Sequence, residues 1–441
     1  MKRLAIGDGA QDITLYQESG PLVYKRAIFG PPRRIENLIE EHLELVLEDA
    51  NPEVIVAAEA DLAAMLRKIE EYHSGFLDRP ICLRISDAGG KVWASRLHGA
   101  RMERSGGDSD NGSLGLRLIM RREDFWQGEE RELPLSNRNG ANVIGGLSVS
   151  NHSDTHAGHD NFVDIASSDV EGDLPSSFHI EMLNSGASGT LTGDIRVGIS
   201  FRGDVRSFWH VLEAEEASGG TLKDDAAASG GGGRTVSWNT AGERDLLAWR
   251  LSILASSRAM GRWFRPLVRL MTPVMDDDLW LGIKVAYGSG LASIKSYPPG
   301  LAAAGKALVE LPAAQIPPFT GGTVNLGQTE VRLYAWQAEG QARSLDVDDL
   351  MILPLDGWRN FQSTGGLESG WRLVDEGEPG ACYSVTATGE RLITHADFGR
   401  PLSAIPGRPH RIYFLQECGG LAPIERTLTV RVFYRPRRIA V

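Results

Sequence analysis

The sequence predicts a mainly β protein with one clear helix, organised as an α+β N-terminal domain followed by a jelly-roll β-sandwich. Three observations support this prediction. Glycine occurs 51 times and proline 21 times, which indicates a chain with many turns. Short alternating runs rich in β-branched and aromatic residues recur along the chain, as expected of strands. One stretch, residues 60–75, has the apolar period of an amphipathic helix.

The bulk composition argues against several classes of function. A formal net charge of −12 disfavours sequence-specific nucleic-acid binding and anionic membrane surfaces, because both need a basic face. We expect no membrane-spanning helix, since the chain contains no run of about 18 apolar residues. No apolar segment follows the basic start of the chain, so no signal peptide is expected. The cysteines Cys82, Cys382 and Cys418 are far apart, which disfavours a disulfide framework and favours a reducing compartment.

The first elements are predicted to be strands. Residues 12–29 alternate on both sides of Ser19-Gly20-Pro21, which predicts a hairpin. In residues 34–49 every second position of the later half is leucine, which favours a strand over the alternative, a charge-rich helix.

The helix is predicted over residues 60–75. Apolar side chains recur at the i, i+3, i+4 and i+7 spacing of one helix face, namely Leu62, Met65, Leu66 and Ile69. Asp61 is placed to cap the start of this helix, and Gly75 is placed to take the left-handed conformation after its end.

After the helix, residues 81–104 predict two strands around a turn at Asp87–Gly90, and a further strand reaches Trp126. We therefore assign residues 1–135 to one α+β domain of antiparallel strands and a single helix.

Residues 136–172 are polar and rich in turns, and we predict that they form a connector with one short strand. Within it, "NHSDTHAGHDNFVDI" (Asn151–Ile165) contains His152, His156 and His159. Their spacing suits zinc only on a helix, and the surrounding glycine, serine and aspartate residues disfavour a helix. We interpret the segment as a polar hinge; the alternative is a structural zinc or calcium site.

Residues 173–360 are predicted to form the sandwich, with residues 218–233 as a flexible glycine-rich loop. This segment holds seven of the ten tryptophans, most of which we expect in the core: Trp209, Trp238, Trp249, Trp263, Trp280, Trp336 and Trp358. Residues 361–441 contain further strands, which either close the sandwich or return to the N-terminal domain.

No catalytic motif is convincing, and we predict that the chain is not an enzyme. Gly300–Ala307 matches a phosphate-binding loop except at its last position, where Ala307 lacks the hydroxyl that would bind magnesium. A pair of carboxylates in a groove, as a glycoside-active enzyme needs, is not identifiable from sequence alone.

Acidic residues at two distant places suggest a metal site. Glu213 and Glu215 are predicted to share one face of a strand, and Asp348 and Asp349 begin another strand. Carboxylates from two paired strands can supply several of the six to eight oxygens that calcium prefers. The alternative is that these side chains are solvated acids at a sheet edge.

Two resemblances extend this interpretation. The Glu213–Glu215 segment, the aromatic strands and "DVDDLMI" resemble carbohydrate-binding modules of the jelly-roll type, although the loop at 218–233 departs from them. That resemblance implies a structural calcium held by Glu213, Glu215 and Asp348 or Asp349. The order of elements in residues 1–126, and "PLSAIPGRPHRIYF" near the C-terminus, resemble siphophage tail proteins of the distal-tail type. This resemblance implies a tail-tube-like N-terminal domain and a galectin-like or carbohydrate-binding outer sandwich.

The sequence therefore predicts a structural component of a phage or phage-like tail, assembled in the host cytoplasm. The resemblance implies a homo-oligomeric ring, expected to be a hexamer around the DNA path, with the tail tube and tail-tip hub as neighbours. The sandwich is expected to contact host surface glycans through tryptophan rings. The alternative is a soluble carbohydrate-binding protein with no virion role.

Overall fold

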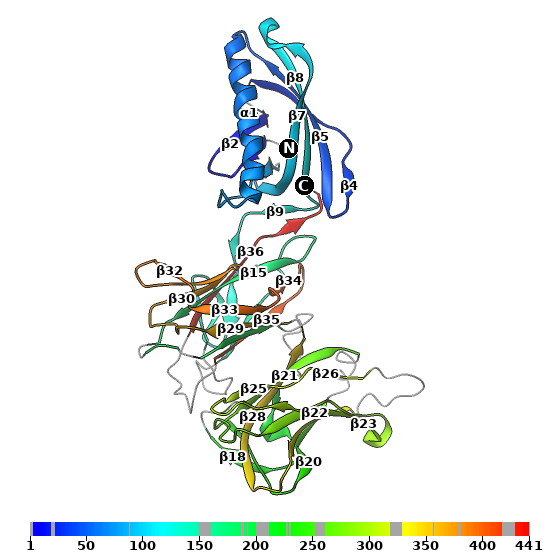
Figure 1. Cartoon of the computed structure of the whole chain (residues 1–441), viewed down its shortest axis with the longest axis vertical. Helices are drawn as coiled ribbons and strands as arrows, with labels where there is room; N and C mark the ends of the chain where they lie inside the picture. Colours follow the sequence, from blue (N-terminus) through cyan, green and yellow to red (C-terminus); the bar gives the residue numbers. More distant parts are fainter. Residues whose placement is uncertain are drawn as a thin grey trace. The chain divides into compact units, whose positions relative to one another are not determined.

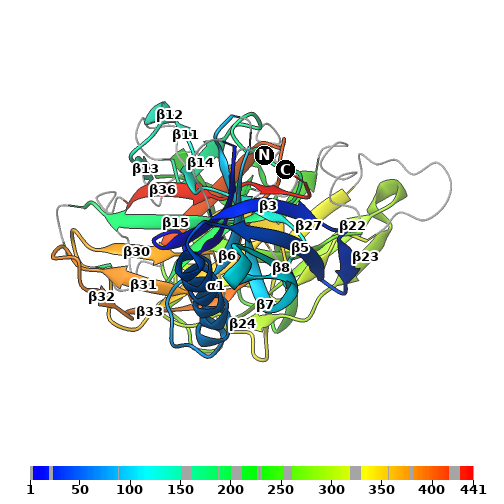
Figure 2. The same ribbon diagram turned by 90° about the horizontal axis from the view of Figure 1, so that it is seen from above.

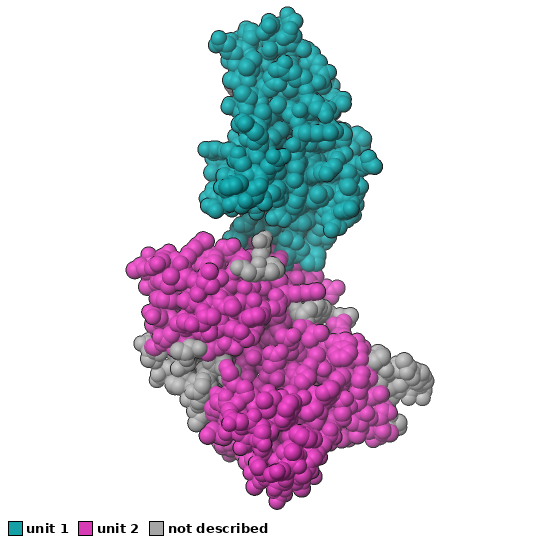
Figure 3. Space-filling view, viewed as in Figure 1, with its two compact units in different colours: residues 1–131, 171–176, 435–441 teal, residues 132–170, 177–434 magenta. Residues whose placement is uncertain are grey.

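The computed structural model describes residues 3–18, 23–87, 89–149, 160–186, 189–191, 193–199, 211–225, 228, 231–251, 261–317, 329–355, 357–377, 381–416 and 428–440. As predicted, these residues form a mainly β protein with several antiparallel sheets and one α-helix (Figure 1). They divide into two compact units (Figure 3). Unit 1 comprises residues 1–131, 171–176 and 435–441, and unit 2 comprises residues 132–170 and 177–434.

Unit 1 is built on one antiparallel sheet, whose main path has the order β2-β1-β6-β7-β8-β5-β3. Its strands are β1 (Arg3–Gly7), β2 (Asp12–Gln17), β3 (Tyr24–Phe29), β4 (Arg33–Ile35), β5 (Leu38–Glu48), β6 (Cys82–Ser86), β7 (Val92–Asp108), β8 (Ser113–Glu123), β9 (Trp126–Gly128) and β37 (Arg437–Arg438). A 3-10 turn, η1 (Ser109–Asn111), links β7 and β8. The prediction of a strand over the later half of residues 34–49 is confirmed by β5, in which Leu43, Leu45 and Leu47 are buried.

The hairpin predicted over residues 12–29 is wrong. β2 pairs with β1 and β3 pairs with β5, so the two strands of the expected hairpin are not hydrogen-bonded to each other. Strand β1 is buried along Leu4–Gly7 and needs a hydrogen-bonding partner on both sides, which β2 and β6 supply. Alternation marks residues as strands, but it does not select their partners. The predicted turn at residues 19–21 lies outside the described residues.

The helix α1 (Pro52–His73) is longer than predicted and begins earlier. Asn51, not Asp61, is its N-cap: the Asn51 side chain accepts a hydrogen bond from the backbone N–H of Glu53. Pro52 occupies the first turn, where no N–H is needed, so Asn51-Pro52 is the stronger start signal. Gly75 has φ of +78°, as predicted for the residue past the helix end. The predicted apolar face is buried, extended by Ile55.

The turn at Asp87–Gly90 is confirmed, because β6 and β7 pair directly across it. Unit 1 is completed by distant parts of the chain. β37, near the C-terminus, pairs with β9, and the backbone N–H of Asp173 donates to the carbonyl of Arg437. Residues 361–441 are thus divided: 361–434 belong to unit 2, and 435–441 return to unit 1.

Unit 2 contains a first sandwich, formed by two sheets. One has β10 (Arg131–Glu132), β13 (Leu147–Val149), β15 (Ser176–Asn184), β30 (Arg372–Asp375), β31 (Cys382–Val385), β32 (Arg391–Leu392), β34 (Ser403–Ala404) and β36 (Leu428–Tyr434). The other has β11 (Leu135–Asn137), β12 (Gly140–Val143), β14 (Phe162–Ile165), β16 (Ile195–Ile199), β29 (Trp358–Ser363), β33 (His395–Gly399) and β35 (His410–Gln416). Figure 2 shows β15 between β36 and β30, with which it is paired.

The segment expected as a connector is part of this first sandwich. Residues 136–172 contribute β12, β13 and β14 and the end of β11, and buried Leu147, Val149, Val163 and Ile165 join its core. The polar composition reflects exposed turns between short strands whose alternate side chains are buried. Residues 150–159, with all three histidines of the predicted hinge, lie outside the described residues.

A second sandwich is inserted between β16 and β29. One sheet has β17 (Val211–Glu213), β18 (Thr221–Asp224), β19 (Gly232–Trp238), β21 (Trp263–Leu270), β25 (Leu308–Glu310), β26 (Ala314–Gln315) and β28 (Arg343–Pro354). The other has β20 (Gly242–Leu251), β22 (Trp280–Tyr287), β23 (Ser293–Ser296), β24 (Gly300–Leu301) and β27 (Thr329–Gln337). The turns η4 (Ala214–Glu216) and η6 (Ser289–Leu291) are 3-10 helices. Residues 221–224, expected within a loop, form β18.

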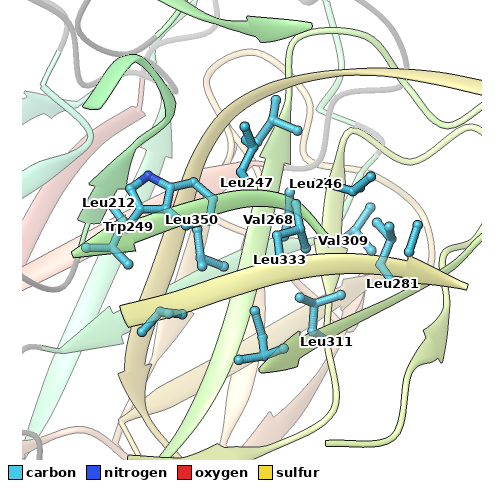
Figure 4. Packing of buried hydrophobic residues seen from close by; sticks show 14 of the residues in the cluster. Leu212, Leu246, Leu247, Trp249, Val268, Leu281, Val309, Leu311, Leu333 and Leu350 are labelled. Atoms are coloured by element: carbon cyan, nitrogen blue, oxygen red, sulfur yellow. The ribbon is translucent and has the colours of Figure 1, made fainter. Parts of the chain in front are cut away.

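The second sandwich has its own core, formed by leucines and valines of both sheets together with Trp249 (Figure 4). Residues 173–360, predicted as one sandwich, are thus divided between two hydrophobic cores. A small apolar cluster joins the two sandwiches: Leu267, Leu308, Met351, Leu353, Trp358, Tyr413 and Leu415. Within the described part of the chain, no helix is long and apolar enough to cross a bilayer.

Candidate binding sites

The predicted acidic residues meet in the second sandwich, at the strand β28. Glu213 of β17 lies opposite Asp349 on one side of β28, and Arg269 of β21 lies opposite Asp349 on the other. The register then shifts, because the next residue of β21 pairs with Val347. Asp348 is therefore the extra residue of a β-bulge, which explains how two consecutive acids can both turn towards one site. Both are buried, at 2% and 1% exposure.

Three carboxylates of this acid cluster (Glu213, Asp348 and Asp349) have oxygens within 4.8 Å of one another. A buried arginine shares the site: Nε of Arg269 lies 2.6 Å from Asp348 Oδ2 and 3.8 Å from Asp349 Oδ2. One guanidinium thus faces three carboxylates in a region with little water, where unbalanced charge is costly.

The electrostatics of the acid cluster reflect this imbalance. Burial, with the charges of Asp348, Glu213 and Glu215, raises the pKa of Asp349 well above its usual range, although Arg269 opposes the rise. Burial alone would lower the pKa of Arg269, but the surrounding carboxylates raise it, so the guanidinium stays charged. Protonation of Asp349 or binding of a cation would each relieve the repulsion among these carboxylates.

Glu215 is placed differently from the prediction. Strand β17 ends at Glu213, and Glu215 lies in the 3-10 turn η4, so the two glutamates do not share a strand face. Glu215 is outside the group of three, and burial, with the nearby charge of Asp348, raises the pKa of its carboxyl group. Turn formation at residues 214–216 is not visible in the alternating sequence.

The acid cluster has the donor chemistry of a calcium site. Carboxylate oxygens are the hard ligands that calcium prefers, and Asp349 Oδ1 is buried without a hydrogen-bond partner. Three carboxylates supply part of a shell of six to eight oxygens, so backbone carbonyls or water would complete it. Arg269 competes for the same oxygens and reduces the charge available to a metal ion.

A second site was not located by the sequence: an exposed tryptophan pair. Of the seven tryptophans expected mostly in the core, Trp238, Trp249 and Trp358 are buried, and Trp209 lies outside the described residues. The other three are exposed, with Trp263 at 46%, Trp280 at 36% and Trp336 at 40%. The expectation therefore holds for three of the six tryptophans of this segment that the structure describes.

Trp280 and Trp336 are neighbours on one sheet. They lie directly opposite each other on β22 and β27, with ring centroids 6.5 Å apart and planes at 90°. Alternation explains their exposure: Leu281 and Leu333 point into the core, so residues 280 and 336 point to the other face. Leu301 of β24, 50% exposed, lies opposite Trp280 on the far side.

Charged side chains continue this face. Lys284 Nζ lies 2.6 Å from Glu243 Oε1 and also forms an ion pair with Asp245. Arg332 bridges Asp245 and Glu330, at 3.2 Å and 2.6 Å. The period-2 pattern of "WLGIKVAY" and "VRLYAWQ" marks these residues as one strand face, but the sequence does not show that the two faces adjoin.

The two cysteines that the structure describes are poor nucleophiles. Burial raises the pKa of the Cys82 thiol to about 11 and that of Cys382 to about 12, so both remain protonated near neutral pH.

Asp160, next to the predicted hinge, is buried and accepts a hydrogen bond from the backbone N–H of Arg138 at 2.7 Å.

Comparisons with known proteins give no family. No family model matches the sequence, and no curated protein matches it. The chain is similar to a structure of the infectious bursal disease virus Gx strain, at 10% identity over 80% of this chain and 72% of that chain, with a TM-score of 0.16. It is also similar to T=1 particles derived from the same virus, at 10% identity over 80% and 70%, with a TM-score of 0.15. At these TM-scores neither likeness carries an argument about function.

Proposed function

We propose that the chain is a structural protein of a phage or phage-like tail, of the distal-tail type. One observation carries the proposal. Residues 1–131 and 435–441 both belong to unit 1, and nearly all of the chain between these two segments forms unit 2. Such a topology suits an assembly platform that carries appended sandwiches. The second sandwich is in turn inserted into the sequence of the first, between β16 and β29. In this proposal unit 1 forms the ring and the sandwiches are presented outside it.

The charges of unit 1 fit the inner surface of a ring through which DNA passes without being bound. Two exposed arginines of the sheet are each paired with an acid: Arg121 lies 3.3 Å from Glu40, and Arg117 lies 2.9 Å from Glu44. Paired charges release few counterions on contact with phosphates, so they give little affinity for DNA. The proposed neighbours are other copies of this chain, the tail tube and the tail-tip hub.

The test is the solution mass of the purified full-length chain by light scattering, with electron microscopy of the same sample. We expect closed rings of about six copies, or about 290 kDa in total for a 48.0 kDa chain. A particle that stays monomeric alone and also when mixed with purified tail-tube and hub proteins would overturn the proposal.

The exposed tryptophan pair favours a second candidate, a carbohydrate-binding protein without a virion role. Both candidates assign no catalysis to the chain. A monomer that binds glycans and does not join tail proteins would favour this second candidate.

A further inference from the structure

We propose that the tryptophan face, defined as Trp280, Trp336, Leu301, Glu243 and Asp245, binds a neutral saccharide. The proposal rests on the proposed function only in taking a host surface glycan as the source of that saccharide. It is argued from the apolar geometry, the fixed acceptors and the charge of this face.

The apolar part of the face has the size of one or two sugar rings. Trp280 and Trp336 stand at right angles, and Leu301 extends the same row across β24. Each is between about a third and a half exposed, although indole rings in a folded domain are normally more covered. A pyranose presents an apolar C–H face that packs on an indole ring and covers it without requiring a large interface.

Gly282, Tyr334 and Lys284, which lie beside the tryptophans, are held rigidly by their packing. The ring of Tyr334 covers Gly282 so closely that a Cβ added there would lie 2.6 Å from it. The Tyr334 hydroxyl donates to the carbonyl of Tyr297, and burial raises its pKa to about 12, so it stays a neutral donor. Lys284 lies above the same ring, 4.9 Å from its centroid. A rigid site loses little entropy when a ligand binds.

The polar part of the face supplies acceptors for hydroxyl groups. Glu243 lies opposite Trp336 on β20, and Asp245 lies opposite Tyr334. Both carboxylates are held by Lys284, yet their side chains remain 44% and 39% exposed. Each therefore has lone pairs directed by the ion pair and still accessible to solvent. Ionised carboxylates only accept hydrogen bonds, so they recognise the O–H donors of a sugar.

The charge of the face selects a neutral ligand. Glu243, Asp245 and Glu330 are matched by Lys284 and Arg332, with Arg250 3.9 Å from Glu330. No uncompensated cation in this described network is available for a carboxylate or sulfate group. A protein partner would bury a wider apolar area than one row of three side chains between charged neighbours. A neutral hexopyranose glycan fits both features.

The experiment is binding of neutral and anionic oligosaccharides to the purified full-length chain, followed by tryptophan fluorescence and calorimetry. We expect at least one neutral oligosaccharide to bind, and Trp336→Ala to weaken it about tenfold or more, as loss of one stacking ring requires. Trp263→Ala is the matched control, because Trp263 is equally exposed but lies on β21 of the other sheet, and it leaves affinity unchanged. Glu243→Gln, which keeps the side-chain size, weakens binding without changing the fold measured by circular dichroism.

Three results would overturn this assignment: no binding of any neutral glycan, equal weakening by Trp263→Ala and Trp336→Ala, or preference for anionic glycans. A fourth is loss of self-association in Trp336→Ala without any sugar binding, which would make the face an interface between copies. Ring formation by the wild-type chain is scored separately. Rings without sugar binding retain the tail proposal and reject this one. Sugar binding by a chain that forms no rings, either alone or with purified tail-tube and hub proteins, retains this proposal and rejects the tail proposal.

Discussion

The two sandwiches of unit 2 each bury an arginine among carboxylates, but they balance its charge differently. In the first sandwich Arg359 is fully buried, with Nε 2.6 Å from Asp375 and Nη2 2.8 Å from Asp397. Asp397 lies partly at the surface, where water shares its charge. In the second sandwich Arg269 faces three carboxylates. The two sites therefore differ in the number of carboxylates around the buried arginine and in how far those carboxylates reach the surface.

The largest effect is expected from removing Arg359, the buried arginine of the first sandwich. Arg359→Met should destabilise the first sandwich by about 3–5 kcal/mol, because Asp375 is left buried without a counter-charge. The measurement is chemical unfolding with limited proteolysis to locate the loss. The double variant Arg359→Met, Asp375→Leu serves as the control and should recover much of the stability. A loss below about 1 kcal/mol in the single variant would contradict this account.

The next effect depends on pH and belongs to the first sandwich. Burial lowers the pKa of His395 and His410 from 6.5 to about 4, so both are neutral when folded. Because the unfolded histidines take up protons first, stability present above pH 6.5 is lost as the pH falls towards about 4. The loss should be on the order of 3 kcal/mol per histidine. The second sandwich (residues 211–354) contains no histidine, so no such loss through histidine is expected there.

The measurement is thermal unfolding from pH 7 to pH 4 for the wild type and for His395→Asn and His410→Asn. Each variant should show a shallower loss than the wild type. Asp375 and Asp349, whose pKa values burial raises, act in the opposite direction, because their folded forms bind protons more readily. Parallel curves for wild type and variants would show that neither histidine is responsible.

A smaller effect is expected at the acid cluster, where we propose that calcium binds. Calcium should raise the melting temperature of the wild type, because it binds the folded carboxylate cluster and not the unfolded chain. Asp349→Asn should abolish this response, and in chelator it should be neutral or stabilising by about 1 kcal/mol, since an amide cannot ionise beside Asp348 and Glu213. Calorimetry with calcium and differential scanning fluorimetry measure both. A wild type indifferent to calcium would favour protonation of Asp349 as the balance.

The smallest effect is expected at a partly exposed acid on the same strand as the acid cluster. Asp346 lies 2.7 Å from Lys223. Burial would raise the pKa of Asp346, but hydrogen bonds from Lys223 and Thr235 lower it. Asp346→Asn should change stability by about 0–1 kcal/mol and leave any calcium response intact. It is therefore the matched control for Asp349→Asn, three residues away. Equal responses of the two variants would remove the distinction between buried and exposed acids of β28.

The sequence by itself determined the local structure of many elements. Alternating leucines predicted β5, and the i, i+3, i+4 pattern predicted the buried face of α1, because each pattern repeats the geometry of its own element. It also selected Glu213, Asp348 and Asp349 as acids that could meet. The start of α1 was predicted too late, since Asp61 was preferred to the stronger Asn51-Pro52 signal.

Only the tertiary structure decided which elements pair and what they expose. The partners of β2 and β3, the insertion of one sandwich into another and the return of residues 435–441 to unit 1 all join residues far apart in sequence. The bulge at Asp348 and the exposure of Trp280 and Trp336 follow from those pairings. The alternation of apolar and polar residues is a local property of one strand. It shows that one face of the strand is buried, but it does not show which neighbouring strand or sheet covers that face.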